Sequence, residues 1–226
     1  MSIKIIVDEN IPFGREFFGS LGEVTLLSGR HITHDTLQGA SALIVRSITP
    51  VNEVLLAGTN IQFVGSTTTG IDHIDVEYLK QERIGFSAAI GANANSVAEY
   101  VLTAILMHSH QRGLRINEIT VGIVGVGNIG TLVAQKAKGL GMKTLLHDPP
   151  RALATGDANF LPLEALCETD FLTLHVPLSN EGPHATFHLF DEDDLAQLSS
   201  HTTLINTSRG AVVDNQALLE GIKKKT

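Results

Sequence analysis

A glycine-rich stretch, TVGIVGVGNIG, is the first part of the chain whose residue types and spacing could do chemistry. Gly125, Gly127 and Gly130 form the pattern G-x-G-x-x-G directly after an apolar, β-branched run. In this pattern the first glycine allows a tight turn, the second lets the backbone approach a pyrophosphate, and the third lets a helix pack closely on the strand. The N–H groups of Asn128 and Ile129, at the start of the expected helix, would face the phosphate charge. The stretch therefore predicts a dinucleotide site, although a lone match also describes a purely structural turn.

An acidic residue follows at the spacing that a dinucleotide site requires. Asp148 ends the next expected strand, 23 residues after Gly125, where a carboxylate that binds the adenosine ribose is expected at roughly 20 residues. Such a carboxylate accepts hydrogen bonds from a 2′-hydroxyl and repels a 2′-phosphate, which favours NAD over NADP. Arg151, three residues later, weakens this preference because a guanidinium would attract the same phosphate.

Two later strands also end in polar residues. LTLHVPL ends its strand at His175, and LINTSRG ends the next at Thr207–Arg209. Ligands of open α/β sheets bind outside the carboxyl ends of the strands, and the guanidinium of Arg209 suits bidentate binding of a planar carboxylate. A salt bridge from Arg209 to a local acid such as Asp214 is the structural alternative. His175 could act as a general base, but a histidine in this position is more often a packing or hydrogen-bonding residue.

The first half of the chain carries hydroxyl groups in two turns, VRSIT and VGSTTTGIDHID. Ser47 and the run Ser66–Thr69 offer hydroxyls and backbone N–H groups, a composition suited to an anionic group. The alternative is that these residues only cap turns and helices, as Asp72 or Asp75 would for the helix that follows. Composition leaves both interpretations open.

Short β-branched runs alternate with helical patterns along the whole chain, which predicts parallel sheets covered on both faces. Five strands are expected in the first half and four more after residue 120, and a long helix over about residues 95–111 separates the two series. In the second half, helices are expected near residues 128–140, 162–167, 191–198 and 215–221. A complete Rossmann fold has six strands, so the strand TTLIN is expected at an open edge.

These patterns predict an α/β protein of two domains. Residues 1–94 are expected to form a flavodoxin-like substrate-binding domain, and residues 95–226 an incomplete Rossmann NAD-binding domain whose last strands are absent. The boundary near Ala94 is taken from the long helix, because no linker of low complexity marks it.

Composition excludes several classes of protein. A formal charge of −8 disfavours nucleic-acid binding, and the single cysteine, Cys167, excludes an intrachain disulfide. The start MSIKIIVDEN leaves no room for a signal-peptide core, and the longest apolar stretch, near residues 97–107, is too short to span a membrane, so a cytoplasmic location is expected. The histidines show no ligand spacing, and His108 and His110 lie on different sides of a helix, so no metal site is expected.

The segments GIVGVGNIG, HDPPR, LTLHVPL and LINTSRGAVVDNQALL, in that order, resemble the D-isomer-specific 2-hydroxyacid dehydrogenases. The resemblance runs from Ile3 to about Leu219. It implies NAD as cofactor, Arg209 as the catalytic arginine, and Ser47 and Thr68 as substrate contacts. Val176 stands where relatives can carry a threonine, so its role reduces to a backbone contact. The residues implied to line the NAD site, with the three glycines, are Asn128, Ile129, Asp148, Val176, Thr207, Ser208 and Arg209.

The reaction implied by this resemblance is the NAD-dependent oxidation of a small phosphorylated 2-hydroxy acid, 4-phospho-D-erythronate, in pyridoxal phosphate biosynthesis. The family takes its base from a histidine paired with an acid, and both are expected beyond Thr226, so we expect this polypeptide to bind NAD weakly and to be inactive alone. A homodimer is expected for the intact enzyme. The alternatives are another dehydrogenase of the family, acting on glycerate or phosphoglycerate, and a non-catalytic NAD-binding module.

Overall fold

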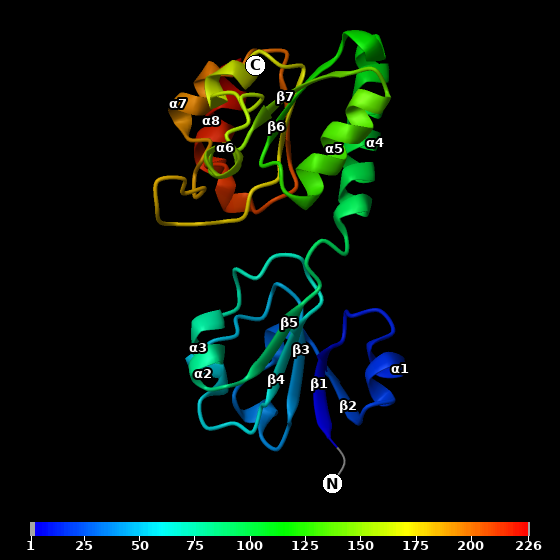
Figure 1. Cartoon of the computed structure of the whole chain (residues 1–226), viewed down its shortest axis with the longest axis vertical. Coiled ribbons are helices and arrows are strands. Elements are labelled where there is room, and N and C mark those ends of the chain that lie inside the picture. The colour runs from blue at the N-terminus through cyan, green and yellow to red at the C-terminus, as the bar shows by residue number, and fades with distance from the viewer. Residues whose placement is uncertain (1–2, 226) are drawn as a thin grey trace. The chain divides into compact units, whose positions relative to one another are not determined.

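The computed structural model describes residues 3–225 and divides between Asn93 and Ala94 into two compact units (Figure 1). Met1, Ser2 and Thr226, at the ends of the two expected domains, lie outside the described residues. Each unit is built on a parallel sheet of its own, as the alternation of strands and helices predicted.

The first unit contains a five-stranded parallel sheet with the order β2-β1-β3-β4-β5, one of the common orders of doubly wound sheets. The central strands β1 and β3 are rich in Val, Ile and Leu, because both faces of the sheet are covered there. The strands are β1 (Lys4–Asp8), β2 (Glu23–Leu27), β3 (Ala42–Val45), β4 (Phe63–Ser66) and β5 (Gly85–Ala88).

Successive residues of these strands point to opposite faces, and each face has its own core. Ile5 and Val7 belong to the cluster under α1 (Gly14–Gly19), whereas Ile6 packs with residues of α2 (Glu53–Leu56) and α3 (Val76–Gln81). Figure 1 shows α1 on one side of the sheet and α2 and α3 on the other. Asp75 caps α3 by accepting a hydrogen bond from the N–H of Tyr78 at 2.9 Å, as one of the two predicted capping residues.

The second unit contains a four-stranded parallel sheet with the order β7-β6-β8-β9. The register pairs the last residues of neighbouring strands, so all four carboxyl ends reach the same edge of the sheet. Within the described residues β9 pairs with β8 alone and forms an open edge, as predicted. The strands are β6 (Thr120–Val124), β7 (Lys143–His147), β8 (Phe171–Leu174) and β9 (Thr203–Asn206).

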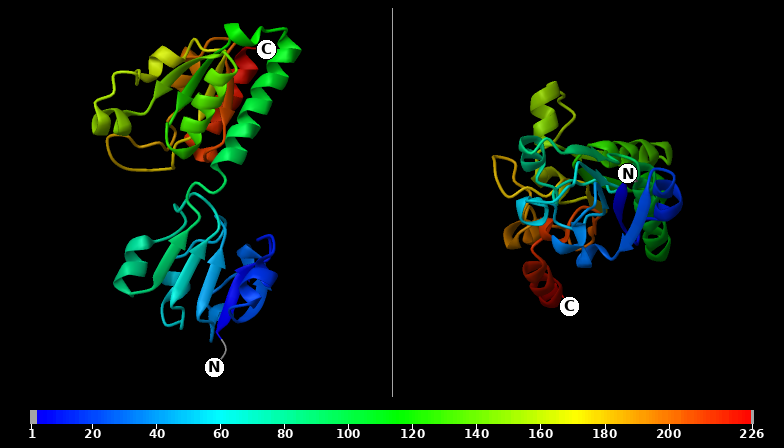
Figure 2. Two further views of the ribbon diagram at one scale, coloured as in Figure 1. Left: turned by 45° about the vertical axis from the view of Figure 1, so that its right-hand side comes forward. Right: turned by 90° about the horizontal axis from the view of Figure 1, so that it is seen from below.

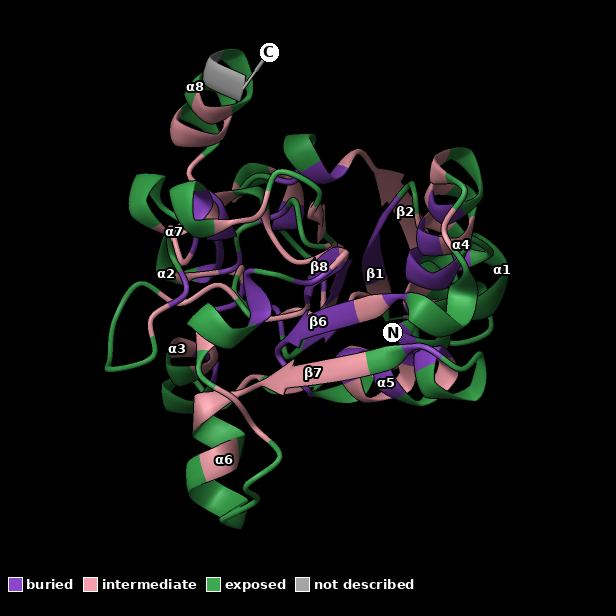
Figure 3. Cartoon of the chain, turned by 90° about the horizontal axis from the view of Figure 1, so that it is seen from above, coloured by how far each residue is buried: buried purple, intermediate pink, exposed green. Residues whose placement is uncertain are grey.

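Helices cover both faces of this second sheet. The long helix α4 (Ala94–Arg112) packs against α5 (Asn128–Gly139), and the two lie side by side in Figure 1 and in the left view of Figure 2. The opposite face is covered by α7 (Glu192–Gln197) and α8 (Asn215–Lys225), whose side chains join a core with Leu172 and Leu174. Figure 3 shows the consequence: β6 is buried almost throughout, while β7 is only half-buried.

Two details of the second unit differ from the sequence-based prediction. Residues 162–167, expected as a helix, contain only the 3₁₀ helix η4 (Leu163–Leu166). Conversely, α6 (Pro149–Thr155) was not predicted, because two adjacent prolines are typical of a turn; proline is nevertheless well tolerated in the first turn of a helix, where its missing N–H has no partner to lose. The other 3₁₀ helices are η1 (Gly29–His31), η2 (Asp35–Leu37), η3 (Ile116–Glu118) and η5 (Gly210–Val212).

No helix among the described residues has both the length and the apolar character that a membrane span requires.

Candidate dinucleotide-binding site

The glycine turn connects β6 to α5, allows two close backbone approaches and leaves the backbone open at a third glycine. Gly125 has a φ of +85°, and a Cβ there would lie 2.7 Å from the carbonyl oxygen of His175. A Cβ on Gly130 would overlap the carbonyl oxygen of Gly125, so the first turn of α5 can lie against the strand end only if this residue is glycine. A Cβ on Gly127 would meet no atom within 4 Å, so the backbone here is open to a ligand. The helix begins at Asn128 and directs its free N–H groups to this side.

Asp148 lies at the end of β7 and uses both carboxylate oxygens on backbone N–H groups. Its Oδ2 accepts from the N–H of Val126 at 2.8 Å, and its Oδ1 caps α6 by accepting from the N–H of Arg151 at 3.0 Å. A carboxylate offers about four acceptor positions, so two remain for the hydroxyls of a ribose. The two backbone contacts fix the carboxylate beside the glycine turn.

A pocket of about 500 Å³ lies where β6, β7 and β8 end. Gly125 and Gly127 line the pocket from the glycine turn, and Asp148 lines it from the end of β7. His175 and Val176 line it from the end of β8. Prolines and the side of the 183–189 segment add apolar walls, which suits a flat aromatic base next to a charged diphosphate.

His175 is half-buried at the end of β8, and both of its ring nitrogens are engaged. Nδ1 lies 2.9 Å from the hydroxyl of Thr207 and Nε2 lies 3.0 Å from the hydroxyl of Thr173. Burial lowers the pKa of the imidazole from 6.5 to about 4. The ring is therefore neutral near pH 7 and joins β8 to β9, which agrees with the hydrogen-bonding role and not with that of a general base.

The segment Thr207–Arg209 follows β9 and is held by its own turn. The Asn206 side chain accepts a hydrogen bond from the N–H of Ser208 at 2.9 Å and donates one to the carbonyl of Arg209 at 2.9 Å. The Ser208 hydroxyl oxygen is buried and has no hydrogen-bond partner among the described residues, so a ligand could satisfy it. Arg209 is half-buried, with Nη1 3.2 Å from the carbonyl oxygen of Ser208.

Asp214, the alternative partner considered for Arg209, contacts His188, with 3.5 Å between Oδ2 and Nδ1. The backbone around this pair forms a short ladder: the N–H of His188 donates to Ala211, that of Phe190 to Val212, and that of Asp214 to Phe190, at 2.8, 3.1 and 2.9 Å. The ladder ties the segment that closes the pocket to the turn that carries Arg209. Sequence spacing gave no sign of it, because 26 residues separate His188 from Asp214.

Ser47 and Thr68 belong to the first unit. Each follows the end of a strand, and because β3 and β4 are paired up to Val45 and Ser66, both residues lie at the same edge of that sheet. Ser47 is exposed, while Thr68 is half-buried with its hydroxyl 3.2 Å from that of Ser66. Within residues 3–225 no group of three or more His, Cys, Asp or Glu side chains is placed to hold a metal ion.

Residues 89–226 match the family model described as D-isomer specific 2-hydroxyacid dehydrogenase, NAD binding domain. The chain belongs to this family. The resemblance noted in the sequence is thereby confirmed, and so is the α/β class with a Rossmann-like NAD-binding domain. NAD, the cofactor that the glycine turn and Asp148 predicted, is the one that this domain of the 2-hydroxyacid dehydrogenases binds.

Relatives of known name extend the comparison. Erythronate-4-phosphate dehydrogenase of Serratia proteamaculans is 50% identical over 223 residues, which are 98% of this chain and 60% of the relative. The enzyme of the same name from Cronobacter sakazakii is 51% identical over 218 residues, 96% of this chain and 58% of the relative. The chain thus spans about 60% of the length of the curated relatives that it matches.

Solved structures with the same fold include dehydrogenases with bound NAD. D-lactate dehydrogenase from Aquifex aeolicus, complexed with NAD and lactic acid, has a TM-score of 0.79 at 25% identity and covers 98% of this chain and 74% of its own. NAD⁺-bound 3-phosphoglycerate dehydrogenase of Entamoeba histolytica has a TM-score of 0.80 at 26% identity, over 99% of this chain and 78% of its own.

Proposed function

We propose that this chain is the cofactor- and substrate-binding part of an NAD-dependent dehydrogenase that oxidises 4-phospho-D-erythronate to 2-oxo-3-hydroxy-4-phosphobutanoate, a step of pyridoxal phosphate biosynthesis. The substrate is taken from the relatives named erythronate-4-phosphate dehydrogenase, at 50% and 51% identity. Bound NAD would supply the hydride acceptor.

One observation carries the proposal: the strands of the second sheet deliver the glycine turn, Asp148, Val176 and Arg209 to the same edge. The dinucleotide would lie with its diphosphate on the N–H groups of Asn128 and Ile129 and its ribose on Asp148. A buried serine hydroxyl without a partner among the described residues, an open backbone at Gly127 and a 500 Å³ pocket all suit such a ligand.

Arg209 would hold the substrate carboxylate and the oxygen on which charge develops during oxidation of the hydroxyl carbon. A half-buried guanidinium at the strand end can make two parallel hydrogen bonds to a carboxylate, which also fixes the orientation of the substrate. Ser47 and Thr68, at the edge of the first sheet, are proposed as substrate contacts on the ground of the family resemblance. A flavodoxin-like fold for residues 1–94, a cytoplasmic location and a homodimeric intact enzyme belong to this proposal as well.

We further propose that the 226-residue polypeptide binds NAD weakly and is essentially inactive by itself. A general base works best when its pKa is near the working pH, and His175, the histidine considered as a general base, has a pKa of about 4 and two engaged nitrogens. Loss of acid–base assistance typically costs about 10² to 10⁴-fold in rate. Steady-state formation of NADH by the polypeptide, purified free of host enzyme, would contradict this.

The test of the main proposal is a titration of the purified chain with NADH, followed by nicotinamide fluorescence, and then of the binary complex with 2-hydroxy acids. We expect saturable NADH binding and a preference of the complex for 4-phosphoerythronate over glycerate and phosphoglycerate. A preference for phosphoglycerate would favour another dehydrogenase of the family, an interpretation supported by the structural likeness to 3-phosphoglycerate dehydrogenase. NADH binding without any effect of a hydroxy acid would favour a non-catalytic NAD-binding module.

A further inference from the structure

The peptide groups on both sides of Val126, the residue between the first two glycines of the turn, are held by side chains from one element. The N–H of Val126 donates to Asp148 Oδ2 at 2.8 Å. Its carbonyl oxygen accepts from Nη1 of Arg151 and, at 3.1 Å, from the hydroxyl of Thr131. Asp148 and Arg151 are the first and last residues of the D-P-P-R element that begins α6.

These contacts fix the direction of two peptide planes. In a trans peptide the C=O and N–H groups point in opposite directions. The carbonyl of Val126 is directed to Arg151, so the N–H of Gly127, on the same plane, points away from the guanidinium. Gly127 lines the 500 Å³ pocket, whereas Arg151 lines a separate pocket of about 260 Å³ behind the turn.

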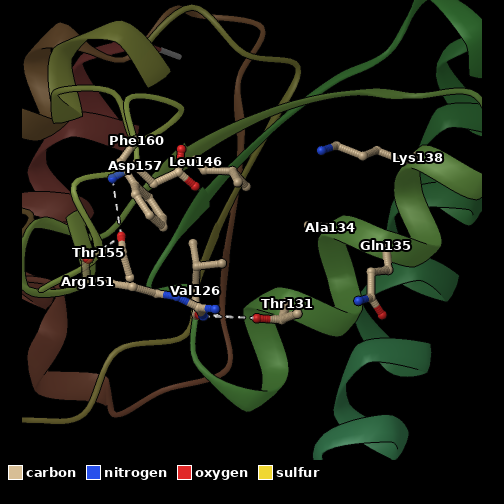
Figure 4. A pocket seen from close by; sticks show the side chains of 10 residues that line it. All are labelled: Val126, Thr131, Ala134, Gln135, Lys138, Leu146, Arg151, Thr155, Asp157 and Phe160. Carbon is tan, nitrogen blue, oxygen red and sulfur yellow. Dashed lines mark hydrogen bonds between the residues drawn. The ribbon is translucent and has the colours of Figure 1, made fainter.

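Figure 4 shows this second pocket. The side chain of Arg151 passes beneath Val126 and reaches Thr131 at the start of α5, 3.3 Å from its hydroxyl, while Lys138 lies farther along the same helix. Arg151 therefore has its Nη1 donors directed at the protein backbone and at a helix hydroxyl. The position of Arg151 in the sequence suggested that it binds the 2′-phosphate of NADP. Its contacts are explained without that role.

We propose that Arg151 is a positioning residue that holds the glycine turn in the conformation that binds the dinucleotide, and that it does not discriminate NAD from NADP. The inference rests on the proposed NAD-dependent function. It predicts equal effects of Arg151 on the affinities of NADH and NADPH, because the turn faces the diphosphate that both cofactors share. A phosphate-reading arginine would instead affect NADPH alone.

The experiment compares the dissociation constants of NADH and NADPH, by nicotinamide fluorescence, for the full chain and four variants. For Arg151→Met we expect Kd for both cofactors to rise about 5- to 20-fold, the effect of losing hydrogen bonds from a charged donor, with the NADPH/NADH ratio unchanged. For Arg151→Lys we expect a smaller rise, because an ammonium can still reach the Val126 carbonyl. For Thr131→Val, which removes the second donor to that carbonyl and also the hydroxyl that Arg151 Nη1 reaches, we expect about a threefold rise in Kd for both cofactors.

Lys138→Met is the matched control. Lys138 lines the same pocket and carries the same charge, but it is exposed and lies away from the Val126 peptide (Figure 4). The Kd values of this variant for NADH and NADPH should stay within about twofold of the wild type, because exposed charges are screened by solvent. If Lys138→Met and Arg151→Met weaken cofactor binding equally, the loss of a positive charge alone explains the effect, and the inference is overturned.

The outcomes also separate this inference from the proposed function. Absence of NADH binding by the wild-type chain contradicts the function itself. Normal binding by the wild type and by Arg151→Met, or loss of NADPH binding only, overturns the positioning role while the function stands. Thermal unfolding of every variant is measured beside the titrations. If Arg151→Met does not fold, the test rests on Arg151→Lys and Thr131→Val. Wild-type affinity for NADH and NADPH in both variants would overturn the inference.

Discussion

The Nδ1 atom of His175 lies 2.9 Å from the hydroxyl oxygen of Thr207, so a side-chain hydrogen bond joins the ends of β8 and β9 at the edge where the site lies. The second ring nitrogen is bonded to Thr173 on β8 itself, at 3.0 Å. A protonated ring would carry its charge in a half-buried environment, and this desolvation lowers the pKa to about 4. Burial therefore favours the neutral imidazole at this contact.

The preference for a neutral His175 ring makes the free energy of unfolding depend on pH. The pKa of His175 is about 4 in the folded chain and near 6.5 when unfolded, so between these values the unfolded state binds a proton that the folded state does not. The stabilisation is fully present above pH 6.5 and is lost as the pH falls toward 4. We expect His175 to account for a loss of about 2 kcal/mol between about pH 7 and pH 5, measured by urea unfolding.

The variant His175→Gln should flatten the pH dependence in that window, because glutamine keeps a donor and an acceptor but does not titrate. His110→Gln, at an exposed position of α4, is the control and should keep the wild-type slope. A slope in His175→Gln as steep as that of the wild type would contradict the assignment.

Gly130→Ala should damage the glycine turn. The added Cβ would overlap the carbonyl oxygen of Gly125, and overpacking of a rigid backbone contact costs about 1 to 3 kcal/mol. We expect a lower unfolding midpoint together with weaker NADH binding. Gly139→Ala, at the other end of the same helix, is the matched control, because a Cβ there would meet no atom within 4 Å and alanine favours helix by up to about 1 kcal/mol.

Arg209→Lys should separate substrate binding from cofactor binding. Lysine keeps the charge but cannot make two parallel hydrogen bonds to a carboxylate, so we expect the affinity of the NADH complex for a 2-hydroxy acid to fall about 10- to 100-fold, with a smaller change for NADH. Competition titrations measure both. Arg115→Lys, in an exposed ion pair with Glu118 at 3.2 Å, should leave both affinities unchanged. Unaltered hydroxy-acid binding in Arg209→Lys would remove the carboxylate role.

The ladder between residues 188–190 and 211–214 should depend on packing more than on charge. Phe190 is fully buried, and Phe190→Ala is expected to cost about 3 to 5 kcal/mol. The side chains of His188 and Asp214 remain 39% and 30% exposed, so His188→Gln should cost less than about 1 kcal/mol. Chemical denaturation of the two variants tests this order, and the reverse order would mean that the ion pair holds the segment.

Sequence alone predicted the strands and the glycine turn because their signals are local. The β-branched runs, the spacing of the three glycines and the carboxylate at position 148 can all be recognised without knowing the rest of the fold. The helix that starts at Pro149 was missed, since two prolines indicate a break unless the capping contact of Asp148 is known.

Contacts between residues that are far apart in the sequence could not be predicted from local sequence patterns. The bond from Arg151 to the carbonyl of Val126 spans 25 residues and depends on the rotamer of a long side chain. The pair of His188 and Asp214 depends on how the segment after β8 returns to β9. The low pKa of His175 follows from burial, which the sequence around it does not specify.

The unpaired edge of β9 affects how the purified protein is expected to behave at high concentration. Within the described residues this strand is paired on one side only, so a row of main-chain donors and acceptors faces outward beside half-buried apolar side chains. Such a row can accept an additional strand, from the same polypeptide or from another molecule, by simple backbone complementarity. Concentrated samples are therefore expected to self-associate through this rim, and short peptides of strand-forming sequence should suppress it.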